Sequence, residues 1–125
     1  MNNHVVIAED EETIASILSQ ILKKHFNYQV SIATSYAQAY ALLESVDPGL
    51  VFIDVNLGDG NGYDLLHTLI SEKKRSAKVI MMSAHTNDSE SLDEFIPEVD
   101  CFISKPFDKG EIIAAVRKVL SLDSD

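Results

Sequence analysis

Short runs of apolar residues alternate along the chain with longer stretches in which apolar residues recur every three or four positions. A short apolar run bounded by turn residues is typical of a strand that is buried on both faces, as in a parallel sheet. We therefore expect strands over residues 5–8, 29–34, 50–54, 79–82 and 100–104. The third run is the most distinctive, because four apolar residues lead directly into Asp54 and a glycine-rich loop follows.

The stretches between and after these runs predict helices that each bury one apolar face. The expected apolar positions are Ile14, Ile17, Leu18, Ile21 and Leu22; Ala39, Leu42, Leu43 and Val46; Leu65, Leu66, Leu69 and Ile70; Leu92, Phe95 and Ile96; and Ile112, Ile113, Val116, Val119 and Leu120. The fourth set, which would follow a cap at Asn87, is the weakest. Ser35 with Gln38 and Asp108 with Glu111 predict capping boxes at the starts of the second and fifth helices.

Strands that alternate with helices at regular spacing predict parallel βαβ units with right-handed crossovers and helices on both faces. The expected fold class is α/β, a flavodoxin-like doubly wound sheet of five parallel strands with five helices. The sequence alone does not fix the strand order. We expect the order 2-1-3-4-5, in which the first and third strands are neighbours and their carboxyl ends border the crevice where such folds bind ligands.

Polar residues stand at the carboxyl ends of four of these strands. Glu9 and Asp10 follow the first, Asp54 ends the third, Ser83 follows the fourth and Lys105 the fifth. With the first and third strands adjacent, the three carboxylates would meet, and they would repel each other unless a proton or a cation sat among them. Such ligands suit Mg²⁺, a lysine suits a phosphate oxygen, and an aspartate can attack phosphorus. The residues expected at this edge of the sheet therefore predict phosphoryl-transfer chemistry.

Composition narrows the function classes. A net charge of −10 argues against a nucleic-acid surface, which needs clustered Lys and Arg. No apolar run approaches the length of a membrane span, and the first residues do not form a signal-peptide pattern. Cys101 is the single cysteine, so an internal disulfide is excluded. We interpret it as an inert buried thiol, and expect a cytoplasmic location because unpaired cysteines suit a reducing compartment.

Four short motifs, each at the end of an apolar strand, resemble those of receiver domains of two-component response regulators. They are Glu9-Asp10, Asp54, Ser83-Ala84 and Lys105-Pro106. The resemblance runs from about residue 5 to residue 120 and implies one receiver domain over residues 1–125. It further implies phosphoryl transfer from a sensor histidine kinase or a histidine phosphotransfer protein with Mg²⁺ present. No independent catalytic output is implied.

The resemblance also assigns roles around the acidic cluster. Asp54 matches the phosphoacceptor, and Asp10 matches the direct ligand of the Mg²⁺ ion. Glu9 would hold a water molecule of that ion, and Asn56 would offer its backbone carbonyl. Glu9, Asp10, Asp54 and Asn56 are therefore the implied metal-site residues.

A second group of residues matches the catalytic and switching positions of the family. Ser83 matches the hydroxyl that moves onto the phosphoryl group, and Lys105 matches the lysine that pairs with it. Phe102 matches the switch aromatic, although a half-buried strand aromatic is an equally good interpretation. The Lys105-Pro106 bond resembles the cis peptide of the family. The implied readout face is the fourth helix, the fifth strand and the fifth helix, read by a downstream protein target or an output domain.

The sequence departs from the family at several positions. Gly58 stands where a loop proline is common, and Phe102 lacks the hydroxyl that a tyrosine would offer. Asn56 and His85 stand at positions that tune the lifetime of the phosphoryl group in this family.

Three alternatives use some of the same residues. A haloacid dehalogenase type of phosphatase needs a second aspartate two residues after the nucleophile, where Asn56 stands. A calcium loop starting at Asp54 fails because Asp59 replaces the invariant glycine and Leu65 replaces the bidentate acid. A receiver-like scaffold that is never phosphorylated would be favoured if Mg²⁺ did not bind.

Overall fold

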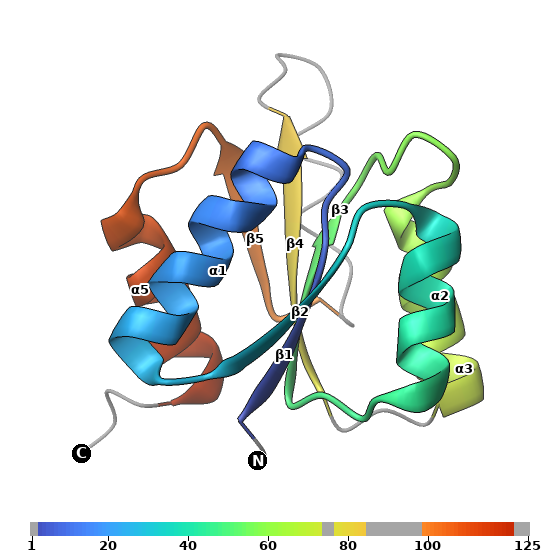
Figure 1. Cartoon of the computed structure of the whole chain (residues 1–125), viewed down its shortest axis with the longest axis horizontal. Coiled ribbons are helices and arrows are strands. Elements are labelled where there is room, and N and C mark those ends of the chain that lie inside the picture. The colour runs from blue at the N-terminus through green and yellow to red at the C-terminus, as the bar shows by residue number, and fades with distance from the viewer. Residues whose placement is uncertain (1–2, 74–76, 85–98, 122–125) are drawn as a thin grey trace.

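The computed structural model describes residues 3–73, 77–84 and 99–121 of the chain (Figure 1). Its elements are β1 (His4–Ala8), α1 (Glu12–Phe26), β2 (Gln29–Ala33), α2 (Tyr36–Ser45), β3 (Leu50–Asp54), α3 (Gly62–Lys73), β4 (Lys78–Ala84), β5 (Cys101–Lys105) and α5 (Lys109–Leu120). The five predicted strands are confirmed, with ends that shift by at most two residues. Four predicted helices are confirmed, and the one expected to follow Asn87 lies outside the described residues.

The strands form one parallel sheet in the order β2-β1-β3-β4-β5, which confirms the doubly wound fold class. β1 pairs with β2 on one side and with β3 on the other, so that Ile7 lies beside Phe52. The direction of winding reverses between these two central strands. Their carboxyl ends therefore border the crevice that such folds use for ligands.

Side chains alternate between the two faces of the sheet and build two separate cores. Leu50 and Phe52 of β3 join the core under α1 and α5, whereas Val51 and Ile53 join the core under α2 and α3. Figure 1 shows these two pairs of helices on opposite sides of the strands. All of β3 is buried, as its continuous apolar run predicted. Asp54 at its end is consequently only 5% exposed.

The two predicted capping boxes differ in the structure. At α5 the box is complete, because Asp108 Oδ1 accepts from Glu111 N and Glu111 Oε1 accepts from Asp108 N, both at 2.8 Å. At α2 only half of the prediction is confirmed. Ser35 Oγ accepts from Gln38 N at 3.0 Å, but Gln38 Oε1 accepts from Thr34 N at 2.8 Å. The glutamine side chain therefore reaches one residue further back than a capping box requires.

Three apolar side chains are more exposed than the patterns suggest. Ile17, predicted on the buried stripe of α1, is 48% exposed, because the line of that helix facing the core runs through Leu18 and Leu22. Ile32 of the edge strand β2 is 41% exposed. Cys101 is half-buried and not fully buried, since β5 forms the other edge of the sheet. Within the described residues, no helix combines the length and apolar content that crossing a membrane requires.

Candidate functional site

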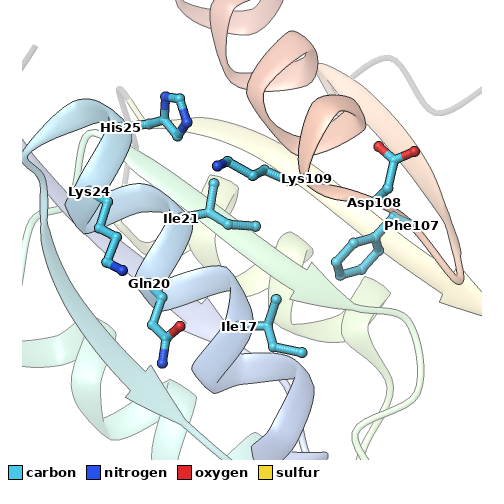
Figure 2. A pocket seen from close by; sticks show the side chains of 8 residues that line it. All are labelled: Ile17, Gln20, Ile21, Lys24, His25, Phe107, Asp108 and Lys109. Atoms are coloured by element: carbon cyan, nitrogen blue, oxygen red, sulfur yellow. The ribbon is translucent and has the colours of Figure 1, made fainter.

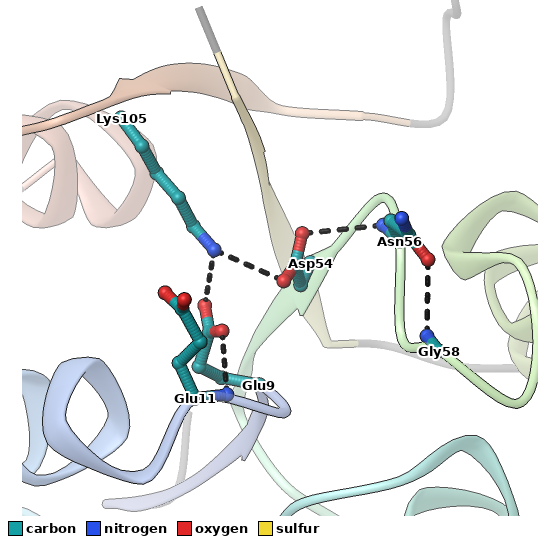
Figure 3. A network of polar contacts seen from close by, with 6 residues as sticks. All are labelled: Glu9, Glu11, Asp54, Asn56, Gly58 and Lys105. Atoms are coloured by element: carbon teal, nitrogen blue, oxygen red, sulfur yellow. Dashed lines mark hydrogen bonds and ion pairs between the residues drawn. The ribbon is translucent and has the colours of Figure 1, made fainter.

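Three charged side chains converge at the carboxyl edge of the sheet (Figure 3). Glu9 directly follows β1, Asp54 ends β3 and Lys105 ends β5. Each stands two positions after a residue of the core under α1 and α5, namely Ile7, Phe52 and Ile103. Because strand residues two positions apart share a face, three separate strands aim these groups at one point.

The ammonium group of Lys105 lies between two carboxylates. Its Nζ atom is 2.8 Å from Glu9 Oε1 and donates to Asp54 Oδ2 at 3.0 Å. The exposed fractions of the side chains are 16% for Lys105, 7% for Asp54 and 0% for Glu9. Charge-assisted contacts that are sheltered from water hold their geometry far better than surface ion pairs do. Lys105 therefore fixes the orientation of both carboxylates.

The second oxygen of each carboxylate accepts from a nearby backbone amide. Glu9 Oε2 accepts from Glu11 N at 3.0 Å, and Asp54 Oδ1 accepts from Asn56 N at 3.2 Å. Burial raises the pKa of Glu9 to about 7, against the opposing effect of the Lys105 ammonium. Burial alone would lower the pKa of Lys105, but its contacts with the two carboxylates raise it. Lys105 thus stays charged, and Glu9 is a group that can hold a proton near neutral pH.

Asp10 completes an acidic cluster at this edge. Carboxylate oxygens of Glu9, Asp10 and Asp54 all lie within 4.8 Å of one another. Asp10 is exposed, and its Oδ2 atom faces the loop after β3, 3.5 Å from where a Cβ atom on Gly58 would stand. Mg²⁺ binds oxygen ligands at about 2.1 Å, so ligands on opposite sides of it stand about 4 Å apart. A small inward movement would therefore fit the three carboxylates to a divalent cation.

The loop between β3 and α3 folds back onto the end of the strand. Gly62 N donates to Val55 O at 2.7 Å, and Gly58 N donates to Asn56 Oδ1 at 3.0 Å. Position 62 requires glycine, because a Cβ atom there would collide with the backbone carbonyl oxygen of Asp54. The glycines that follow the third strand thus serve a close approach of the loop to the candidate site.

Comparison with known proteins adds to this geometry. The family model described as the response regulator receiver domain matches residues 5–117. The chain belongs to this family. The transcriptional regulatory protein YvrH of Bacillus subtilis is 28% identical over 116 residues, which cover 93% of this receiver chain and 48% of YvrH. The sensory transduction protein RegX3 of Mycobacterium tuberculosis is 28% identical over 121 residues, which cover 97% of this chain and 52% of RegX3. The chain thus spans about half the length of these curated relatives.

Solved structures show that the receiver fold is shared. Response regulator DrrB, an OmpR/PhoB homologue of Thermotoga maritima, has a TM-score of 0.81 and 21% identity, covering 98% of this chain and 54% of DrrB. The signal receiver domain of a histidine kinase from Syntrophus aciditrophicus has a TM-score of 0.81 and 22% identity, covering 98% of this chain and 94% of that domain. At such identities the likeness supports the fold alone.

The receiver structure brings together most of the residues singled out in the sequence. Glu9, Asp10, Asp54 and Lys105 meet at one point, and the backbone of Asn56 is bonded to Asp54. The Lys105-Pro106 peptide bond is cis, as the resemblance implied.

The two residues expected to act as switches lie outside the contact network of Figure 3. Ser83 follows Met82, which pairs with Asp54, so Ser83 stands at the same edge and is partly exposed. Phe102 is half-buried and packs against the core under α2 and α3. His85, expected to tune the phosphoryl group, lies outside the described residues.

Sequence reasoning missed two contacts of this receiver, one at Glu9 and one in the loop after β3. The backbone amide of Glu11 holds the second oxygen of Glu9. The carboxylate of Asp59 accepts from the backbone amides of Tyr36 and Ala37 at the start of α2. The sequence Asp59-Gly60 is a turn signal, but a bonded amide 23 positions earlier leaves no local pattern that could have revealed it.

A groove of about 240 Å³ lies between α1 and the start of α5 of the receiver (Figure 2). Its apolar lining includes Ile17, Ile21 and Phe107, and its charged lining includes Lys24, Asp108 and Lys109. Phe107 lies two positions after the lysine of the site. The segment at the end of β5 therefore contributes Lys105 to the site and, two positions later, Phe107 to the groove.

Proposed function

We propose that this receiver, taken as one domain over residues 1–125, accepts a phosphoryl group on Asp54. The donor would be the phosphohistidine of a sensor histidine kinase or of a histidine phosphotransfer protein. The observation that carries the proposal is the contact of 3.0 Å between Lys105 Nζ and Asp54 Oδ2, at an edge where Glu9 and Asp10 add carboxylates. Membership in the receiver family supports the same function.

Asp54 is the nucleophile of the proposed reaction. One carboxylate oxygen attacks the phosphorus atom, a P–O bond forms as the P–N bond of the donor breaks, and the imidazole leaves with that electron pair. The Asp54 side chain is held by bonds to Lys105 and to the backbone of Asn56, which orient it before the donor arrives. Lys105 needs only a short shift to neutralise a phosphoryl oxygen.

Mg²⁺ is the proposed cofactor, and when bound it would neutralise charge on the phosphoryl oxygens as a Lewis acid. Glu9, Asp10 and Asp54 would hold it, together with the backbone carbonyl of Asn56. Both oxygens of Glu9 already have partners, the Lys105 ammonium and a backbone amide. Both oxygens of Asp54 are also engaged, by Lys105 and the Asn56 amide, so the exposed Asp10 is the carboxylate best placed to be a direct ligand.

Ser83 and Phe102 are the proposed switch. Ser83 stands one position after the residue that pairs with Asp54, and partial exposure allows its hydroxyl to turn toward a phosphoryl oxygen. Phe102 would then change its packing in β5. The proposed readout face comprises the fourth helix, β5 and α5, of which the structure describes β5 and α5. A downstream protein target or an output domain would read it, and the net charge of −10 argues against direct contact with nucleic acid.

The groove between α1 and the start of α5 is the proposed docking site of the donor protein. Ile17 is 48% exposed there and can be covered by an apolar side chain of a partner. Lys24, Asp108 and Lys109 line the same groove, so charged groups of both signs are available to a partner around that apolar contact.

Phosphorylation by acetyl phosphate in the presence of Mg²⁺ tests the proposal. We expect the wild-type protein to gain the mass of one phosphoryl group in intact mass spectrometry, and Asp54→Asn to gain none. Asp64→Asn is the matched control, because it removes an exposed aspartate of α3 outside the acidic cluster, and it should gain the same mass as wild type. An adduct on Asp54→Asn, or a wild-type protein without one, would contradict the proposal.

A further inference from the structure

The loop that carries Asn56 is fastened to a second element, the start of α2. Asp59 Oδ1 accepts from Tyr36 N at 2.7 Å, and Asp59 Oδ2 accepts from Ala37 N at 3.2 Å. Both amides belong to the first turn of α2, where backbone N–H groups lack partners within the helix. Asp59 therefore caps a helix that begins 23 positions before it.

Gly60 brings the same loop into contact with the same helix. A Cβ atom on Gly60 would lie 2.6 Å from the ring of Tyr36, so the loop backbone rests directly on that ring. Tyr36 packs in turn against the core under α2 and α3. The loop is thus held by two hydrogen bonds to a carboxylate and by an aromatic contact that is itself anchored.

The opposite side of the loop borders the acidic cluster. Asn56 N donates to Asp54 Oδ1 at 3.2 Å, and Gly58 stands where a Cβ atom would be 3.5 Å from Asp10 Oδ2. Asp59 is the next residue after Gly58, so any movement of Asp59 displaces the backbone beside the carboxylates. The loop therefore links the first turn of α2 to the candidate cation site.

We propose that Asp59 is a positioning residue for the cation site. By fastening the loop to the first turn of α2, it sets where the backbone carbonyl of Asn56 stands relative to Asp10 and Asp54. The inference rests on the proposed function, because the cation is the Mg²⁺ of that site. Ser35 caps the same helix end through a different amide, accepting from Gln38 N at 3.0 Å, so it is a matched capping residue that lies outside the loop.

The charge of Asp59 suits this role. Its bond from Tyr36 N, and more weakly its bond from Ala37 N, lower the pKa of the Asp59 carboxyl below its ordinary value. The positive end of the helix also favours a carboxylate over a carboxylic acid. Asp59 is therefore ionised, and accepts both bonds, throughout the neutral pH range.

Titration with Mg²⁺ by isothermal calorimetry separates positioning from capping. Asp59→Ala and Ser35→Ala each remove a cap from the start of α2, but only Asp59 reaches it from the loop. We expect Asp59→Ala to weaken Mg²⁺ binding about tenfold, as removal of an outer partner of a metal ligand does. Ser35→Ala should bind Mg²⁺ as wild type does. Asp59→Asn keeps an acceptor for Tyr36 N and should recover part of the affinity.

Unchanged Mg²⁺ affinity in Asp59→Ala, or an equal loss in Ser35→Ala, overturns the inference. A wild-type protein that binds no Mg²⁺ counts against the proposed function instead, and amide hydrogen exchange then decides whether Asp59 positions the loop. Exchange of the Asn56 and Gly58 amides should speed up in Asp59→Ala and not in Ser35→Ala. Equal exchange in the two variants refutes the fastening of the loop by Asp59.

Discussion

At the scale of single residues, Lys105 balances charges that the fold has forced together. The carboxylates of Glu9 and Asp54 are 0% and 7% exposed, and the Lys105 ammonium is within 3.0 Å of both. Without that ammonium their repulsion could be relieved only by a proton or by another cation. A divalent cation at this edge would use the same oxygens. Lys105 and Mg²⁺ are therefore expected to compete while no phosphoryl group is present.

Lys105→Met tests this competition, because it keeps most of the length of the side chain and removes its charge. We expect tighter Mg²⁺ binding in calorimetry, together with phosphorylation by acetyl phosphate that is slower by on the order of a hundredfold at saturating Mg²⁺. Lys109→Met, which removes an exposed lysine of α5, should change neither quantity. Weaker Mg²⁺ binding in Lys105→Met would show that the ammonium supports the cation site.

Glu9 predicts a pH dependence of stability in the metal-free protein. Its pKa rises from 4.5 in the unfolded chain to about 7 in the folded protein, because burial disfavours the charged form. Folding therefore favours protonated Glu9. The contribution of Glu9 to the free energy of unfolding is complete below pH 4.5 and is lost as the pH rises to about 7. Glu9→Gln, which stays neutral, should gain stability relative to wild type across this window.

Urea unfolding in the presence of a chelator, at several pH values, measures that difference. The free energy of unfolding of Glu9→Gln minus that of wild type should increase between pH 4.5 and 7 and level off above it. A constant difference across the window would mean that Glu9 is ionised in the folded protein throughout.

At the scale of elements, the junction between β3 and α3 sets the geometry of the site. Gly62 is the first residue of α3, and its amide donates to Val55 O at 2.7 Å, one residue after the strand ends. The backbone carbonyl of Asp54 occupies the space that a side chain at position 62 would need. The helix can therefore start this close to the strand only with glycine at that position.

Gly62→Ala should destabilise the protein by about 3 kcal/mol or more, because the new methyl group must displace backbone and not a flexible side chain. Gly110→Ala in the first turn of α5 is the matched control. There the nearest atom to a new Cβ would be Asp108 Oδ1 at 3.4 Å, an ordinary contact. Alanine is the better helix former by about 1 kcal/mol, so this variant should be slightly more stable than wild type. Urea midpoints compare the two, and similar midpoints would show that the junction adapts.

At the scale of the whole molecule, the sequence predicted those features that leave a regular pattern of apolar and polar residues along the chain. The run that ends at Asp54 specified a strand buried on both faces, and β3 is one. Alternation with amphipathic helices specified the parallel sheet, and chemistry at the strand ends favoured the order that the structure has. Glu9, Asp54 and Lys105 could be found because strand ends in a parallel sheet share one edge.

The features that were missed depend on which distant segments touch. Ile17 has the spacing of a core residue, but its exposure depends on where α1 lies on the sheet and on what covers its flank. Asp59 has the sequence of an ordinary turn, and its bonds to α2 depend on the loop after β3 meeting the first turn of that helix in space. Neither arrangement repeats along the chain, so no periodic pattern records it.

The position of Lys105 in the sequence has a consequence for folding of the nascent chain. The lysine comes 51 residues after Asp54, on the last strand of the sheet in sequence order. During translation, Glu9 and Asp54 are therefore synthesised well before Lys105, whose ammonium group neutralises them. Until β5 joins the edge of the sheet, a compact folding intermediate cannot bury both Glu9 and Asp54 as unpaired carboxylates. It must leave them in water, protonate one of them, or bind a counterion from the surrounding solution.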